Sequence, residues 1–362
     1  LSRILSRGRS FCISLKTSMV DPPKVDSSSS SRATARRLRS TVVHAIRDFF
    51  VRQDFLEVDT PLLVAAPGSE ATLDPLQVRG PTGTSGWLIS SPEHHMKRLL
   101  CDGESRIYQI CRCFRGGEHS PHHREEFTMV EWYRRDADYQ QIATDVEQLV
   151  AHVASTYSGH LTVQDPHGVS VDLTPPWPQW TIADAMAEFA GIHLPPPDDA
   201  TGLHAAAVAA GMSSINPEDD WETAFYKILI ERVEPSLART GRGVHLLDWP
   251  APMAALSRLS RSNPSVAERV ESYAGGLELS NGFSELTDPR EQRRRFRTER
   301  LRRHNRQGSL LPVDESFLRG LARGMPDAAG VALGLDRLML LVSPTNDLRY
   351  LAPHVMEHRG TE

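Results

Sequence analysis

Residues 106–133 carry the pattern that most restricts the fold of this chain. From Arg106 to Phe114 the side chains alternate as in a strand with one buried face. A polar loop over 115–125 follows, and a second β-rich run extends from Phe127 to Tyr133. Two such runs joined by a loop predict an antiparallel hairpin with a long, charged tip.

Helical and extended segments surround this hairpin in mixed order. Leu38, Val42 and Ile46 recur at helical spacing, which predicts an amphipathic helix from about 34 to 53. Ser91-Pro92-Glu93 is a strong helix start, and the helix is expected to continue to Leu100. Further helices are predicted over 139–157, 182–190, 221–234, 289–307 and 330–342, and strands over 55–61, 87–89, 243–249 and 266–283. This mixture predicts an α+β fold.

Composition limits the class of protein. A charged content of 24% and an apolar content of 40% are those of a globular chain. The longest apolar run, Leu338 to Val342, is far shorter than the roughly 20 residues of a membrane-spanning helix. Four cysteines form no disulfide framework, and a net charge of −5 excludes a surface made as a whole to grip nucleic acid. We therefore expect a cytoplasmic protein without a membrane partner.

Three regions of different character are expected along the chain. Residues 1–32 carry Arg and Ser without an acid before Asp21, which is typical of a transit peptide or of an over-extended reading frame. We expect this extension to be disordered or non-native. Residues 33–350 are predicted to form one domain with a helical insertion near 160–240, and 351–362 a flexible tail.

Charged residues in or beside predicted strands point to a binding site, because their burial is costly without a partner. Arg115 and Arg337 are suited to gripping a polyphosphate through planar guanidinium contacts. Glu278 and Glu285 flank an Asn-Gly pair, interpreted as a turn, and can hold a divalent metal ion or an ammonium group. Phe127 can stack on a base. Together these residues predict a site for a nucleoside triphosphate, Mg²⁺ and an amine-bearing substrate.

The same segments resemble a known family. The helix and strand ending at Pro61, the hairpin with Phe114-Arg115, and Gly334-Leu335-Asp336-Arg337 resemble motifs one, two and three of class II aminoacyl-tRNA synthetases. Ser90-Ser91-Pro92-Glu93, Glu126 to Tyr133, and Asn281 to Leu286 narrow the resemblance to the lysyl branch. The resemblance covers about 33–342 and implies an antiparallel sheet flanked by helices, with motif one forming a homodimer interface.

Within that branch, the chain resembles the free-standing members that ligate (R)-β-lysine to elongation factor P. Lysyl-tRNA synthetases carry an OB-fold anticodon-binding domain before the catalytic one, whereas only a short Ser-rich segment precedes the first helix here. The resemblance therefore implies ATP and Mg²⁺ as cofactors, a lysine-type amino acid as substrate, elongation factor P as acceptor, and no binding of a tRNA anticodon. Ala332 stands where lysyl-tRNA synthetases have glycine, and this favours β-lysine.

The resemblance also implies roles for individual residues. The amino-acid pocket would comprise Ser91, Glu93, Tyr133, Glu285 and Ala332. Contacts with ATP would come from Arg115, Gly117, Glu118, His123, Arg124, Phe127, Glu278, Leu279, Asn281, Gly334 and Arg337. Arg115 and Arg337 would be catalytic, and Glu278 and Glu285 would coordinate Mg²⁺. Gly117 and Arg124 depart from the family pattern of an acid and an asparagine, and Glu118 can replace the missing acid.

Two other functions stay open at this point. A truncated synthetase paralogue would activate α-lysine for another acceptor, and a catalytically silent paralogue would only bind a ligand or partner. The helix over 289–307 holds nine arginines and is either a docking site for an acidic partner or RNA, or a solvated face. The spacing of Cys111 and Cys113 and of the paired histidines does not favour a zinc site.

Overall fold

The computed structural model describes residues 29–351, except 69, 82, 84, 119, 121, 166–167 and 344–347. The predicted extension lies outside the described residues up to residue 28, and its last four residues, 29–32, belong instead to a helix that begins at Ser29. The predicted tail lies outside the described residues from residue 352 onward. Leu351, the first residue of that tail, belongs instead to helix α11 (Leu348–Leu351). None of the described helices is both long and apolar enough to cross a lipid bilayer.

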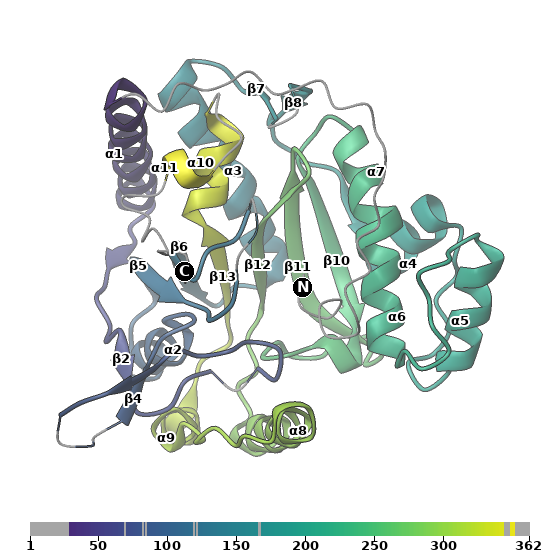
Figure 1. Cartoon of the computed structure of the whole chain (residues 1–362). Helices are drawn as coiled ribbons and strands as arrows, with labels where there is room; N and C mark the ends of the chain where they lie inside the picture. Colours follow the sequence, from purple (N-terminus) through teal and green to yellow (C-terminus); the bar gives the residue numbers. More distant parts are fainter. Residues whose placement is uncertain are drawn as a thin grey trace, which may run out of the picture.

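A sheet of eight strands forms the centre of the molecule (Figure 1). Its strand order is β1-β5-β6-β13-β12-β11-β10-β9, and every neighbouring pair from β5 to β10 is antiparallel. The strands are β1 (Leu56–Glu57), β5 (Arg106–Phe114), β6 (Glu126–Arg135), β9 (Gln179–Thr181), β10 (Val244–Pro250), β11 (Val266–Ala274), β12 (Leu277–Ser284) and β13 (Ala328–Gly334). The predicted α+β fold with an antiparallel sheet is confirmed.

Helices cover both faces of this sheet. On one face lie α1 (Ser29–Arg52), α3 (Tyr139–Ser158), α10 (Leu335–Val342) and α11. On the other lie α2 (Glu93–Cys101), α8 (Pro289–Gln307) and α9 (Glu315–Gly324), beside a small sheet of β2 (Leu63–Val64), β3 (Gln77–Arg79) and β4 (Ser85–Leu88). The first face is closed by apolar packing, while the second holds the cavity described below.

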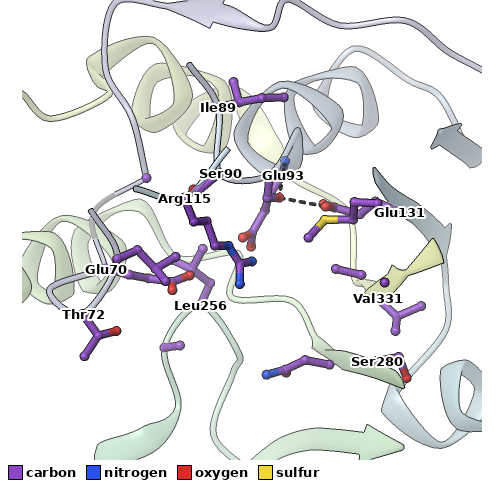
Figure 2. Close-up of a pocket in the computed structure, with 18 of the residues that line it drawn as sticks. Glu70, Thr72, Ile89, Ser90, Glu93, Arg115, Glu131, Leu256, Ser280 and Val331 are labelled. Carbon is purple, nitrogen blue, oxygen red and sulfur yellow. Dashed lines mark hydrogen bonds between the residues drawn. The ribbon is translucent and has the colours of Figure 1, made fainter. Parts of the chain in front are cut away.

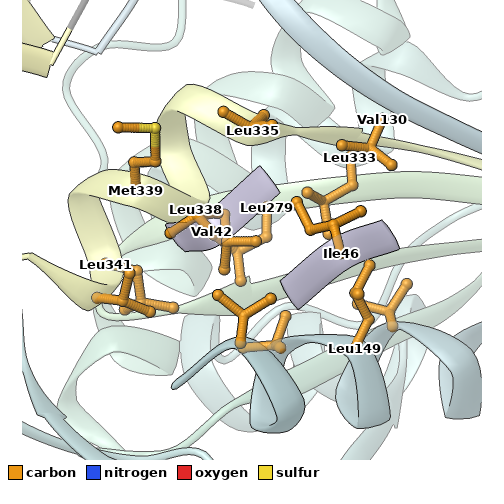
Figure 3. Close-up of a cluster of buried hydrophobic side chains, with 14 of the residues drawn as sticks. Val42, Ile46, Val130, Leu149, Leu279, Leu333, Leu335, Leu338, Met339 and Leu341 are labelled. Carbon is orange, nitrogen blue, oxygen red and sulfur yellow. The ribbon is translucent and has the colours of Figure 1, made fainter. Parts of the chain in front are cut away.

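The main apolar core fills the space between the sheet and the first helical face (Figure 3). Val42 and Ile46 of α1, Leu338 of α10 and Leu149 of α3 are fully buried there against Leu333 of β13. These side chains come from segments up to about 300 residues apart, so burying them fixes the order of the strands. Because β13 and α10 are contiguous, this core also fixes the start of α10, where Arg337 lies.

The segment between α3 and β10 contains more than the predicted helices. It forms β7 (Thr162–Gln164), β8 (Ser170–Asp172), α4 (Ile182–Ala185), η1 (Met186–Ala190), α5 (Ala200–Ala209), α6 (Trp221–Ile228), η2 (Leu229–Val233) and α7 (Glu234–Arg239). It also supplies β9, which pairs in parallel with β10 and so belongs to the main sheet. A 3-10 turn, η3 (Ala251–Met253), follows β10. The division into domains stays a prediction.

Two interpretations from the sequence are wrong. Residues 330–334 belong to the strand β13, and the apolar helix begins only at Leu335. A short apolar run rich in Gly and Ala has no periodicity that separates strand from helix. The Asn281-Gly282 pair lies inside β12, where it pairs with Ala332 and Val331, and makes no turn.

Candidate active site

A cavity of about 380 Å³ opens on the second face of the sheet. Figure 2 shows Glu93, Glu131 and Arg115 around it, with their charged ends directed into the same space. The residues predicted for the site that line this cavity are Ser91, Glu93, Arg115, Glu118, His123, Arg124, Phe127, Tyr133, Glu278, Leu279, Asn281, Ala332, Gly334 and Arg337. Gly117 and Glu285 are not among its lining residues. The structure thus brings segments from five strands and helices to one cavity.

The register of the sheet sets the order of side chains across the cavity floor. Glu131 of β6 pairs with Ala332 of β13, which pairs with Asn281 of β12, which pairs with Glu271 of β11. Neighbouring strands are about 4.8 Å apart, so these four residues form one row across the sheet. The methyl group of Ala332 therefore lies between a carboxylate and an amide, on the floor of the cavity.

One end of the cavity is acidic. Glu131, only 2% exposed, accepts hydrogen bonds from Ser91 Oγ at 2.7 Å and from the hydroxyl of Tyr133 at 2.5 Å. Burial, reinforced by the negative charge of Glu93, raises the pKa of Glu131 to about 7. Ser91 Oγ also accepts the backbone N–H of Glu93 at 3.0 Å, which fixes the start of α2. A buried carboxylate with so high a pKa gains from a cationic ligand, because the ligand restores its charge.

Lys97 lies behind this acidic end. Its side chain is 1% exposed, its Nζ is 2.5 Å from Glu285 Oε2, and it donates a short hydrogen bond to Glu93 Oε1. Burial disfavours the charge of Lys97, but Glu285 and Glu93 outweigh it and raise the pKa of Lys97. The ammonium ion is therefore kept between two carboxylates, of which only Glu93 lines the cavity.

The other end of the cavity is basic. The guanidinium of Arg115 lies over the ring of Phe127, 5.0 Å from its centroid. Arg115 Nε is buried and has no hydrogen-bond partner among the described residues, so it is a donor available to an anion entering the cavity. Arg337 Nη1 donates to the backbone oxygen of Glu278 at 2.6 Å and lies 3.3 Å from its carboxylate. The two arginines predicted to be catalytic thus line the same cavity.

His123 is held in a neutral state at this basic end. Burial, together with the nearby charge of Arg337, lowers its pKa to about 4. Neutral His123 can accept a hydrogen bond from Arg337 Nη2 at Nε2, 2.7 Å away, and donate from Nδ1 to Ser120 Oγ, also 2.7 Å away. The tip of the hairpin is thereby attached to α10.

Gly117 has a different environment from the one predicted. It has a positive φ of 68°, and its N–H donates to Glu125 Oε1 at 2.5 Å across the hairpin tip. Positive φ values favour glycine, so Gly117 shapes the tip rather than offering a side chain. Glu118, the next residue, lines the cavity, as does Arg124.

Gly330 of β13 leaves no room for a side chain. A Cβ atom at Gly330 would lie 2.3 Å from the Tyr133 ring and 2.7 Å from Glu285 Oε1. Gly330 is therefore required for the packing of Tyr133, a residue of the acidic end. At Gly334 a Cβ atom would meet Arg337 at 3.6 Å, which is ordinary contact.

Glu278 and Glu285 have different surroundings. Glu278 lies near the start of strand β12 and Glu285 directly after its end, and the seven residue steps between them correspond to roughly 20 Å of extended chain. Glu278 contacts Arg337, whereas Glu285 contacts Lys97. Among the described residues there is no cluster of three or more His, Cys, Asp or Glu side chains able to hold a metal ion. Coordination of Mg²⁺ by Glu278 and Glu285 stays a prediction.

Sequence reasoning missed several residues of the site. Glu131 and Lys97 stand within the segments quoted above, yet neither received a role. Arg39 of α1 donates to Asp336 Oδ1 at 2.8 Å and to Thr128 Oγ1 at 2.5 Å, and so connects α10 to β6. Apart from contacts within their own helix or strand, these residues contact partners far away in sequence, so local patterns give no signal for them.

A second missed cluster extends the cavity along β11. Arg269 donates to Glu271 Oε1 at 2.6 Å and to Asn281 Oδ1 at 3.2 Å, and it lies over the ring of Trp249. Asn281 Nδ2 donates to Glu271 at 3.0 Å. The side-chain amide of Asn281 is therefore held in a fixed orientation at the cavity floor.

The predicted Arg-rich helix is confirmed as α8 (Pro289–Gln307). Some of its arginines contact other parts of the protein: Arg293 forms an ion pair with Glu315, and Arg303 bonds to Leu73 O and Asp74. Gln292 and Arg295 line the cavity. A docking role for its outer face stays a prediction.

Comparison with known proteins identifies the family of this chain. The family model of class II tRNA synthetases (D, K and N) matches residues 21–357. The chain belongs to the class II tRNA synthetase family. In this class II synthetase, Arg115 directly follows strand β5 in the hairpin β5–β6, and Arg337 lies in helix α10.

Several relatives of this class II synthetase chain are 35–36% identical to it over most of its length. Elongation factor P–(R)-beta-lysine ligases of Pectobacterium atrosepticum and Edwardsiella ictaluri are each 36% identical over 84% of this chain and 89% of their own length. A lysine–tRNA ligase of Dehalococcoides mccartyi is 35% identical over 88% of this chain and 64% of its own length. The chain is thus an amino-acid ligase of the synthetase type, similar to enzymes of both names.

Proposed function

We propose that the chain activates (R)-β-lysine as an acyl-adenylate at the expense of ATP and transfers the β-lysyl group to a lysine ε-amine of elongation factor P. The observation that carries this proposal is the polarity of one cavity. Glu93 and Glu131 form an acidic end suited to ammonium groups, and Arg115 and Arg337 form a basic end suited to a polyphosphate. The names of the relatives support the same acceptor and amino acid.

In the first step, a carboxylate oxygen of the amino acid attacks the α-phosphorus of ATP, and the bond to the β-phosphate oxygen breaks to release pyrophosphate. Arg115, whose Nε has no partner within the described part of the chain, would neutralise the charge that builds on the α-phosphate. In the second step, the acceptor ε-amine attacks the acyl carbon, and AMP leaves. No protein nucleophile is needed, because orientation and charge neutralisation supply the acceleration.

The residues at the basic end fit a nucleoside triphosphate. The buried, unpaired Arg115 Nε is a donor that an anion would satisfy, and the face of Phe127 next to it offers a surface for a base. Mg²⁺, when bound, would neutralise part of the charge of the triphosphate. Glu278 is the carboxylate best placed to hold it, with the remaining ligands supplied by phosphate oxygens and water.

The acidic end supports a substrate with two amino groups. Glu93 and Glu131 both line the cavity, and Tyr133 and Ser91 hold the carboxylate of Glu131 in place. Ala332 lies beside Glu131 on the cavity floor, so its methyl group reduces the depth available next to that carboxylate. We assign to this methyl group the preference for an amine on the β-carbon over one on the α-carbon.

A second copy of the chain is the proposed partner in a homodimer. Val51, Leu56, Leu62 and Leu63 are all exposed apolar side chains in the region of motif one. Exposed apolar side chains concentrated in one region are typical of a protein–protein interface. The cytoplasm is the proposed location.

Mass spectrometry of the acceptor tests the proposed function. The chain is incubated with elongation factor P, ATP, Mg²⁺ and either (R)-β-lysine or α-lysine. We expect one lysine of the factor to gain the mass of a β-lysyl group, at a rate at least tenfold above that with α-lysine, the lower end of what one methyl group can discriminate. Equal or faster transfer of α-lysine would support the alternative, an α-lysine-activating paralogue. Absence of any transfer would contradict the proposal.

A further inference from the structure

Lys97 is a buried cation next to a site that we assign to cationic groups. It lies on α2, four residues after Glu93, and this spacing places both side chains on the same face of the helix. Lys97 does not line the cavity, whereas Glu93 does. The positive charge of Lys97 would repel a cationic ligand in the neighbouring site, so the presence of this lysine needs a physical explanation.

The contacts of Lys97 supply that reason. Its Nζ is held on one side by Glu285 Oε2, at 2.5 Å, and lies 4.9 Å from the centroid of the Phe283 ring. On the other side it donates to Glu93 Oε1, and no described residue donates a hydrogen bond to Glu93 Oε2, which is left for a ligand in the cavity. A carboxylate held by one oxygen presents the other in a fixed direction. Glu285 in turn is buried beside Gly330 and Tyr133.

We propose that Lys97 is a positioning residue of the amino-acid site: anchored by Glu285, its ammonium fixes the carboxylate of Glu93 so that the free oxygen receives an ammonium group of a diamino acid. This inference rests on the proposed function, because it assumes that the cavity binds such a substrate. Glu285 contributes to this positioning by holding Lys97 through Oε2, 2.5 Å away.

Burial excludes another role for Lys97. With a side chain that is 1% exposed, its amine cannot attack an acyl group in the cavity. Lys97 also holds two carboxylates together that would otherwise disfavour each other's charge. Removing Lys97 alone would leave Glu285 as an unpaired buried carboxylate, and the fold itself would be at risk.

The test therefore removes both charges of the buried Lys97–Glu285 ion pair together. The double variant Lys97→Met/Glu285→Gln replaces both charges by neutral side chains of similar size, and its reference is Glu285→Gln alone. Amino-acid-dependent exchange of pyrophosphate into ATP gives KM for (R)-β-lysine, KM for ATP and kcat of each protein. We expect the double variant to show a KM for β-lysine about tenfold above that of Glu285→Gln, with KM for ATP within twofold, because only Glu93 loses its anchor.

Two further variants separate positioning from structural support. In a Glu93→Gln/Glu285→Gln background, adding Lys97→Met should change the Kd for β-lysine, measured by calorimetry, less than twofold, because no Glu93 carboxylate remains to be oriented. Lys227→Met is the matched control: Lys227 is a buried lysine paired with Asp219 at 2.6 Å, away from the lining of the cavity. We expect this control to lower the melting temperature without changing KM for β-lysine.

The outcomes distinguish the inference from the function on which it rests. If the double variant has the same KM for β-lysine as Glu285→Gln, Lys97 only neutralises Glu285, and the inference is overturned while the proposed function stands. If both KM values and kcat change together, or Lys227→Met raises KM equally, the effect is general destabilisation and the inference is again overturned. If the unaltered chain shows no exchange with either lysine isomer, the proposed function fails first.

Discussion

Arg337 donates from Nη2 to Nε2 of His123 across 2.7 Å, although the two residues are 214 positions apart in the chain. This bond connects the third motif, at the start of α10, with the tip of the hairpin that carries the second motif. Because burial and Arg337 lower the pKa of His123 to about 4, the histidine remains a neutral acceptor at physiological pH. The basic end of the cavity is therefore assembled before a nucleotide arrives.

Glu131→Gln should weaken the binding of the amino acid and leave the binding of ATP unchanged. The change removes a carboxylate of the acidic end and keeps the size of the side chain. Hydrogen bonds to charged groups contribute about 1.5–3 kcal/mol, so we expect Kd for a lysine-type amino acid to rise roughly 10- to 100-fold. Calorimetry measures it. A Kd for ATP that rises by as much would contradict the separation of the two ends.

Ala332→Gly should shift the preference between the two lysine isomers. The substitution removes the methyl group that lies between Glu131 and Asn281 in the sheet register. One methylene in a pocket is worth about 1–3 kcal/mol, and we expect the ratio of kcat/KM for β-lysine over α-lysine to fall about tenfold. Pyrophosphate exchange with each isomer gives this ratio. An unchanged ratio would remove Ala332 as the selector.

Arg39→Met should destabilise the protein more than Arg47→Met, although both arginines lie on α1. Arg39 bonds to Asp336 and Thr128 in a part-buried place, whereas the pair of Arg47 with Glu57 is exposed. We expect the free energy of unfolding to fall by about 2 kcal/mol for Arg39→Met and by less than about 1 kcal/mol for Arg47→Met. Urea unfolding measures both. Equal losses would mean that Arg39 does not secure α10.

Stability should depend on pH through Glu131. Burial raises its pKa in the folded state from the usual 4.5 to about 7. The folded protein thus binds this proton more tightly than the unfolded chain, and the resulting stabilisation is complete below 4.5 and is lost as the pH rises through about 7. The melting temperature of the unaltered chain, minus that of Glu131→Gln, should therefore fall between pH 5 and pH 8. A difference that is constant or rises would contradict the raised pKa.

Local patterns in the sequence predicted much of the fold, and long-range pairings account for what was missed. Alternation predicts Arg106–Phe114 with the bounds that β5 has, and helical spacing places α3 and α8 within a residue or two. The strand β13 was mistaken for the start of a helix because 330–334 is short, apolar and poor in branched side chains. The edge strand β9 was missed because only its pairing with β10 makes it a strand.

For the site, too, local motifs predicted residues correctly but did not reveal their long-range pairings. Motifs predicted Arg115, Phe127, Tyr133, Asn281 and Arg337, and all of them line one cavity. They did not reveal that Glu285 pairs with Lys97, because the spacing of residues in the sequence does not show which side chains come into contact in the fold. Nor did they reveal Arg39, whose partners lie 89 and 297 positions away.

The central claim is that one cavity joins an acid-lined site for a diamino acid to an arginine-lined site for ATP. Exchange of labelled pyrophosphate into ATP, with purified chain, Mg²⁺ and no acceptor protein, tests it most directly. The account predicts exchange that requires (R)-β-lysine, is weaker with α-lysine and is lost in Arg115→Ala. Exchange that proceeds without any added amino acid, or none with either lysine isomer, would contradict it.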